Sequence, residues 1–179
     1  MGHDGPADLE APRIERARPA DIADAVAVQH RAFERVARWL GLSDSSLLAP
    51  IAESVTDVER LVMDTGVIVL VARLGEEAAA AIVGTVRGAP RDDGSVEIGR
   101  LAVDDGLENR GVGRALMLAI EDEFPDTGRF LLFTGKEATG PIHLYESLGY
   151  RTVGEEEFRP GLFLVWMEKR RRGRVDSTA

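Results

Sequence analysis

The chain has 179 residues, of which 44% are hydrophobic and 30% are charged, enough for one domain with a full core and too few to suggest two. It has no cysteine, which excludes disulfides, thiolate metal sites and a cysteine nucleophile and favours a cytoplasmic location. No apolar run approaches the ~20 residues of a membrane-spanning helix, so we expect no membrane partner.

The net charge of −9 is unevenly distributed along the chain. The residues from Lys169 onward contain five positive charges and one negative charge, so the part before them carries −13. An acidic body repels nucleic acid and favours cationic partners such as amines. We interpret residues 170–179 as a basic disordered tail and the aperiodic residues 1–12 as a disordered leader. A single domain over residues 13–169 remains.

The first half of this domain is predicted to contain a strand, two helices and an antiparallel meander. A short strand is expected at 13–17, and Pro19 favours the start of a helix with a buried stripe that ends at Gly41. A loop that covers a site is expected at 43–50, before a second helix at 55–63. Apolar runs then predict strands at 67–73, 79–87 and from Val96 onward, joined by turns at 74–77 and 90–94.

The second half is predicted to add a parallel strand to this sheet. The strand from Val96 to Val103 is followed by a helix over 112–124 and a strand over 129–134, and such a strand–helix–strand unit implies a parallel pair. A helix over 139–148 and a hairpin of 150–158 with 162–168 complete the domain. The predicted fold class is therefore α/β.

A glycine-rich turn, Glu108-Asn109-Arg110-Gly111-Val112-Gly113-Arg114, joins the Val96 strand to its helix. The first N–H groups of a helix have no internal partner, and the helix dipole adds partial positive charge there. A strand, a glycine-rich loop and a helix start therefore favour binding of phosphate or pyrophosphate. The loop matches neither the Walker pattern nor the dinucleotide fingerprint, because Leu116 stands where the latter needs a small residue.

These residues resemble the acetyl-CoA-binding core of the GNAT acetyltransferase superfamily. Arg110-Gly111-Val112-Gly113 is similar to its Gln/Arg-x-x-Gly-x-Gly/Ala loop, preceded by Leu101-Ala102-Val103, and 144–150 (LYESLGY) is similar to its second motif. The resemblance covers roughly residues 13–169. It implies a mixed, mostly antiparallel sheet of six to seven strands with a central splayed parallel pair, flanked by about four helices. Two positions depart from the family: Glu108 replaces its Gln or Arg, and an upstream asparagine is missing near Thr139.

The resemblance also implies which residues bind acetyl-CoA as co-substrate. The pantetheine lies between the splayed strands, and the pyrophosphate meets the helix start. The implied cofactor-binding residues are Leu101, Ala102, Val103, Asn109, Arg110, Gly111, Val112, Gly113, Arg114, Ala115, Thr134 and Thr139.

Glu97 and Tyr145 are the catalytic candidates. A lysine-like amine has a pKa near 10.4, so the neutral amine needed for attack costs roughly 4–5 kcal/mol at pH 7, and a carboxylate base reduces this cost. Glutamate is a poor strand former, so Glu97 within a central strand suggests a role, although it also suits a solvated strand end. The family's tyrosine at the position of Tyr145 donates to the departing sulfur. Core packing is the other explanation of Tyr145.

The acceptor side has weaker signals. His30, Phe33 and Trp39 are candidates for lining an acceptor pocket, and no pair of histidines has metal-ligand spacing, so no metal is expected. The leading hypothesis is an acetyl-CoA-dependent N-acetyltransferase that acts on a small-molecule or peptide amine by direct attack in a ternary complex. The alternative is a catalytically silent acyl-CoA-binding or regulatory module of the same fold. A nucleic-acid partner is not expected, and the resemblance allows a homodimer.

Overall fold

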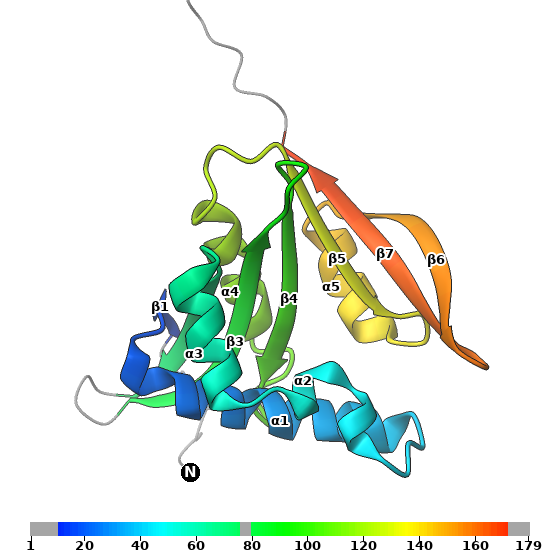
Figure 1. The fold of residues 1–179 in the computed structure, drawn as a ribbon, viewed down its shortest axis with the longest axis horizontal. Coiled ribbons are helices and arrows are strands. Elements are labelled where there is room, and N and C mark those ends of the chain that lie inside the picture. Colours follow the sequence, from blue (N-terminus) through cyan, green and yellow to red (C-terminus); the bar gives the residue numbers. More distant parts are fainter. Residues whose placement is uncertain (1–10, 76–79, 172–179) are drawn as a thin grey trace, which may run out of the picture.

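The computed structural model describes residues 11–75 and 80–171. Its strands are β1 (Arg13–Arg16), β2 (Ile68–Leu74), β3 (Ala81–Pro90), β4 (Val96–Val103), β5 (Arg129–Gly135), β6 (Arg151–Arg159) and β7 (Leu162–Arg170). They form one seven-stranded sheet in the order β1-β2-β3-β4-β5-β7-β6 (Figure 1). Neighbouring strands are antiparallel except β4 and β5, which are parallel. The predicted mixed α/β fold with a central parallel pair is confirmed.

Helices cover both faces of the sheet. They are α1 (Ile22–Trp39), α2 (Ala49–Ala52), α3 (Val55–Asp64), α4 (Val112–Asp122) and α5 (Thr139–Ser147), with 3-10 turns η1 (Pro19–Asp21) and η2 (Ser45–Leu47). The apolar stripe of α4, through Leu116 and Ile120, packs with Val96 and Ile98 of β4 in a core that also includes Tyr145 of α5. Helices α1 and α3 pack on the opposite face, in two smaller apolar clusters. Figure 1 shows α1 and α3 on one side of the sheet and α4 and α5 on the other.

The parallel pair is hydrogen-bonded at one end only. Register pairs join Val96 to Phe130 and Glu97 to Leu131, and the pairing stops there. We call the remaining parts of these strands, residues 98–103 and 132–135, the β4–β5 divergence. The rest of β5 pairs with β7 along its full length, so β5 stays in the sheet while its other edge turns away from β4. The central splayed pair is therefore present, and its backbone groups on the inner edges are available to a ligand.

The face opposite α4 and α5 is less covered on the C-terminal half of the sheet. Phe130 and Leu132 are buried in the α4–α5 core, so Phe133 points to the other face, where it remains 39% exposed. Its ring contacts that of Trp166 on β7, with centroids 5.0 Å apart. Apolar side chains therefore border this side of the divergence.

The structure corrects several predicted boundaries. The expected loop at 43–50 contains η2 and the start of α2, because Asp44 caps η2 by accepting from the Ser46 N–H at 3.0 Å and Pro50 favours the first turn of α2. Strand β6 begins at Arg151 rather than Tyr150, whose side chain is buried in the core. Strand β7 runs to Arg170, so the first residue of the predicted tail pairs with Arg129 in the sheet.

Some predictions concern residues outside the described part. The leader at 1–10, the tail from 172 onward, and residues 76–79 with the predicted start of β3 at Ala79 lie there. Within the described residues, no helix is both long enough and apolar enough to span a membrane.

Candidate functional site

The loop before α4 ends in a helix start that no side chain caps. Gly111 is the N-cap, with φ of 83°, and Asn109 also has a positive φ of 60°. The first helical bond runs from the Ala115 N–H to the Gly111 carbonyl at 2.9 Å, so the N–H groups of 112–114 have no partner within the helix. A Cβ added at Gly111 would meet no atom within 4 Å. Free donors at a positive helix end therefore face open space, as an anion site requires.

The residues around this helix start are mostly exposed. Arg110 is exposed, and Arg114 is exposed with its Nη1 donating to Ser147 Oγ of α5 at 3.0 Å. A hollow of about 290 Å³ beside the loop is lined in part by Pro12, Leu107 and Arg110. Two arginines beside uncapped N–H groups give the chain charge-assisted donors for a phosphate group.

The other predicted cofactor residues border the divergence. Leu101 and Val103 pack against the α4–α5 core, whereas Ala102 between them is buried on the α1 side. On the opposite strand Thr134 pairs with Val165 of β7, and Thr139 is the exposed first residue of α5. The predicted residues at the start of α4 and those along the separating strands therefore lie at the same end of the sheet.

Glu108, the departure from the family loop, is held by residues that the sequence analysis missed. Its Oε1 accepts from Arg35 Nη2 at 3.0 Å, and its Oε2 accepts from the Gly106 N–H at 2.9 Å. Arg35 Nη2 also donates to the Val103 carbonyl at 2.8 Å, and its Nε lies 2.8 Å from Asp105. Glu108 therefore shapes the loop and is paired with a cation, which limits its repulsion of a bound phosphate.

Tyr145 lies in the core next to the divergence. Its side chain is 8% exposed and shares the α4–α5 cluster with Leu132, and its ring meets that of Tyr150 edge-on at 6.1 Å. Among the described residues no hydrogen bond involves its hydroxyl, and the hydroxyl oxygen is not sealed from solvent. Burial raises the pKa of Tyr145 to about 12, so the phenol stays protonated at neutral pH. It is a free donor on the α4–α5 side.

Glu97 lies on the other face of the sheet. It is the last β4 residue paired with β5, and its neighbours Val96 and Ile98 point into the α4–α5 core. The Glu97 side chain is 32% exposed, and its Oε2 accepts from Arg91 Nη1 at 2.5 Å. The two catalytic candidates therefore approach the divergence from opposite faces.

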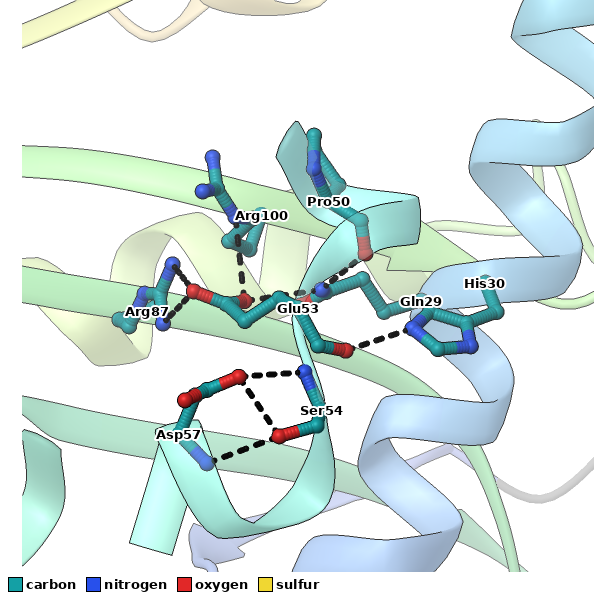
Figure 2. Close-up of polar contacts among 8 residues, drawn as sticks. All are labelled: Gln29, His30, Pro50, Glu53, Ser54, Asp57, Arg87 and Arg100. Carbon is teal, nitrogen blue, oxygen red and sulfur yellow. Dashed lines mark hydrogen bonds and ion pairs between the residues drawn. The ribbon is translucent and has the colours of Figure 1, made fainter. Parts of the chain in front are cut away.

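A second polar cluster, which the sequence analysis missed, lies on the Glu97 face. Glu53, directly after α2, accepts from both Nη atoms of Arg87 at 2.9 Å and from Gln29 Nε2 at 3.0 Å (Figure 2). The Arg100 Nε lies 3.4 Å from the other carboxylate oxygen, and His30 Nε2 lies 2.9 Å from the Glu53 carbonyl. We call Gln29, Glu53, Arg87 and Arg100 the Glu53 cluster.

The electrostatics of this cluster favour an ionised glutamate. Burial alone raises the pKa of Glu53, but the hydrogen bond from Gln29 and the charge of Arg87 outweigh it and hold the pKa below its usual range. Burial lowers the pKa of Arg100, and the neighbouring Arg87 adds to this effect. The only sequence signal of the cluster is the presence of arginines within otherwise apolar strands.

The three residues predicted to line an acceptor pocket do not share one environment. His30 lies beside Glu53, and Phe33 packs on the small core cluster between α1 and the sheet. Trp39, at the C-terminal end of α1, is 59% exposed. Of the three, the structure places only His30 next to the Glu53 cluster.

Comparison with known proteins identifies the family of this fold. The model of the acetyltransferase (GNAT) family matches residues 33–150, about two thirds of the chain and including both predicted motifs. The chain belongs to the GNAT acetyltransferase family.

Solved structures of GNAT proteins share the fold of this GNAT chain. The ribosomal-protein-alanine N-acetyltransferase from Brucella melitensis matches with a TM-score of 0.65 at 23% identity, covering 88% of this chain and 99% of its own. The PaiA N-acetyltransferase from Thermoplasma acidophilum, solved with coenzyme A, matches with a TM-score of 0.70 at 16% identity, over 90% and 100% of the two chains. The ribosomal-protein-S18-alanine N-acetyltransferase from Escherichia coli matches with a TM-score of 0.68 at 15% identity, over 94% and 99%. No curated protein sequence matches the chain significantly.

Proposed function

We propose that the protein is an acetyl-CoA-dependent N-acetyltransferase that moves the acetyl group to a primary amine by direct attack in a ternary complex. The observation that carries this proposal is the uncapped start of α4 beside a parallel strand pair that separates after two register pairs. Acetyl-CoA combines a pyrophosphate with an extended pantetheine arm, so its two parts suit these two features. Family membership and the coenzyme A in the Thermoplasma structure support the same donor.

On the donor side, we assign the pyrophosphate to the loop and first turn of α4. The N–H groups of 112–114 would donate to it, with Arg110 and Arg114 adding charge. The pantetheine would pair with backbone groups of Leu101 and Val103 on one side and of Thr134 on the other. Thr139, at the start of α5, is the polar side chain that replaces the missing asparagine.

On the chemical side, acetyl-CoA supplies an acetyl group activated as a thioester, and the protein must handle two protons. We assign Glu97 to remove a proton from the ammonium of the acceptor. Its ion pair with Arg91 joins two partly exposed side chains, and such pairs contribute little energy, so the carboxylate can exchange partners. We assign the Tyr145 hydroxyl to donate a hydrogen bond to the departing thiolate, and the second proton of the nitrogen, released after attack, passes to this thiolate through solvent.

The acceptor class remains a small-molecule or peptide amine. The negative charge of the domain attracts a cationic amine. Two structural neighbours are named for ribosomal-protein alanine, which is compatible with a peptide acceptor.

Calorimetric titration with coenzyme A and acetyl-CoA tests the donor site. We compare the wild type with Gly111→Glu, which places a carboxylate where the phosphates should lie. Gly66→Glu is the matched control, because Gly66 also has a positive φ, of 69°, and open space around its Cβ position, but lies after α3. We expect binding to be lost in Gly111→Glu and retained in the control.

A panel of amines, followed by thiol release from acetyl-CoA, then tests catalysis. Thiol release that depends on an amine supports the enzyme. Binding without turnover of any amine supports the silent acyl-CoA-binding module instead. Absence of binding by the wild type contradicts both.

A further inference from the structure

The guanidinium of Arg100 is only partly used by the protein. Its Nε makes one long contact, 3.4 Å, with Glu53 Oε2. Among the described residues, neither terminal nitrogen has a hydrogen-bond acceptor, and neither is sealed from solvent. In Figure 2 the guanidinium end points away from the Glu53 carboxylate. The two Nη atoms of this planar guanidinium are therefore free to donate, and the side chain is 20% exposed.

The Glu53 cluster also has an uncompensated positive charge. Glu53 is already bonded to both Nη atoms of Arg87 and to Gln29, so its acceptor capacity is largely filled. The nearest other pair, Glu97 with Arg91, is neutral as a unit. These two pairs, Glu53 with Arg87 and Glu97 with Arg91, together carry no net charge. Arg100 therefore adds one net positive charge. Burial and the proximity of Arg87 lower the pKa of Arg100, and this effect exceeds the opposing effect of Glu53 and Glu97, so an added anion would stabilise the charged guanidinium.

The backbone holds Arg100 in an unusual conformation. Its φ is 57°, in the left-handed region that costs a residue with a Cβ ~1–2 kcal/mol. The β3–β4 register shifts here, between Thr85 and Arg87, so two β4 residues oppose one residue of β3. Bulges of this kind re-aim a side chain and are frequent next to active sites. Arg100 therefore stands at a position where a glycine would fit more easily.

The position of Arg100 connects it to the proposed chemistry. It follows Glu97 by three residues and lies just beyond the last β4–β5 register pair. A strand advances ~3.3 Å per residue, so the two Cα atoms are at most ~10 Å apart. An acceptor whose amine meets Glu97 can therefore reach Arg100 with a group only a few bonds away.

We propose that Arg100 binds a carboxylate of the acceptor, so the acceptor is an amine that carries a carboxylate a few bonds from its nitrogen. This rests on the proposed acetyl transfer and narrows its acceptor class. A free amino acid and a peptide with an acidic first residue both present this group. A planar carboxylate can take both free donors of the guanidinium at once, and such bidentate pairs are strong and directional. The ammonium of the same molecule would be attracted by the net negative charge of the domain.

The test uses four acceptors that differ only in carboxylates: glutamate, its α-amide, glutamine and glutamine amide. Glutamate and glutamine at the first residue of a tripeptide amide form the peptide arm, in which only the side-chain carboxylate can vary because the α-carboxyl is in the peptide bond. Thiol release gives kcat/KM for the wild type, Arg100→Asn and Arg100→Lys. Asparagine tolerates positive φ better than most residues, so Arg100→Asn removes the guanidinium without adding strain. Arg60→Gln, at an exposed arginine of α3, is the control for a change of net charge.

We expect the wild type to prefer one carboxylated acceptor over its amide by about tenfold or more. This preference should fall to about onefold in Arg100→Asn, persist in part in Arg100→Lys and be unchanged in Arg60→Gln. Coenzyme A affinity should be the same in all four proteins. Preference in the free amino acids identifies a small-molecule acceptor, and preference confined to the tripeptides identifies a peptide.

Three results would overturn the inference. Turnover of amines without any carboxylate preference in the wild type rejects it while leaving acetyl transfer intact. A preference that survives Arg100→Asn assigns the carboxylate to another residue. If no acceptor turns over, the glutamate set is titrated by calorimetry into protein loaded with coenzyme A. If binding there depends neither on the carboxylate nor on Arg100, the inference about Arg100 is also rejected. If coenzyme A itself does not bind, the proposed function is rejected.

Discussion

Replacing Tyr145 by phenylalanine should separate catalysis from stability. The Tyr145 hydroxyl has no partner among the described residues, so its removal breaks no hydrogen bond within the described protein and leaves the buried ring in place. We expect the free energy of unfolding to change by less than about 0.5 kcal/mol. If the hydroxyl donates to the departing sulfur, kcat should fall by about 10²-fold, the effect of removing one donor from a developing anion.

The raised pKa defines how Tyr145 can act. With a pKa of about 12 for the phenol and ~8.5 for a thiol, complete proton transfer to the thiolate is uphill by about 5 kcal/mol. Tyr145 should therefore donate a hydrogen bond and keep its proton. Loss of the Tyr145 proton should therefore cause no change in kcat below pH 10. Because the folded pKa is the higher one, its contribution to stability is complete below pH ~10 and is lost as the pH rises toward 12.

Tyr150→Phe is the matched control, because it removes a hydroxyl that is bonded. Tyr150 donates to the buried Glu121 Oε1 at 2.9 Å, and Lys169 holds the other oxygen. Loss of a hydrogen bond to a charged group should cost about 1.5–3 kcal/mol of stability. Urea unfolding and thiol release, with an amine found in the panel, measure both quantities. A Tyr145→Phe protein with kcat within twofold of the wild type would refute the donor role, and a stability loss above 1 kcal/mol would reveal a partner.

Three further changes test other contacts. Glu53→Gln leaves two arginines without their anion and should lower stability by about 2–4 kcal/mol at pH 7. Because the Glu53 pKa is lowered on folding, the wild type should begin to lose this stability below about pH 4.5 and lose it further as the pH falls through the lowered folded pKa, whereas the variant should not, as urea unfolding at pH 7 and at about pH 3 will test. Glu108→Ala frees the loop and should weaken coenzyme A binding about 3–10-fold by calorimetry, and Glu108→Gln by less than about twofold. Tighter binding by both would mean that Glu108 repels the phosphates. Gly88→Ala places a Cβ 2.5 Å from the Phe124 ring and should cost about 1–3 kcal/mol, and a thermal midpoint equal to the wild type would contradict this packing.

Local patterns in the sequence were sufficient to predict α4 and the glycine-rich loop before it. The spacing of apolar residues over 112–124 and the glycines before it determine where α4 starts, and both act within a few residues. The parallel pair followed from one strand–helix–strand unit. The short α2 was missed because four residues carry no periodicity.

The Glu53 cluster could not be predicted in this way, because its contacts join distant parts of the chain. Glu53 meets Arg87 and Arg100 across 34 and 47 residues, and Arg35 reaches Val103 across 68. An arginine within a strand has the same local sequence whether it is a solvated surface residue or a ligand. Only the bulge at Arg100, which depends on the β3–β4 register, distinguishes these cases.

The incomplete pairing of β4 with β5 means that the sheet consists of two parts joined by few hydrogen bonds. One part is β1–β4 and the other is β5–β7, and two register pairs connect them. Under the proposed function an extended molecule would lie between these two parts in the place of a strand, so its binding energy would also hold them together. Amide hydrogen exchange along 98–103 should therefore report ligand occupancy more directly than exchange elsewhere in the sheet. In such a protein the stability of the fold would rise with the concentration of its ligand.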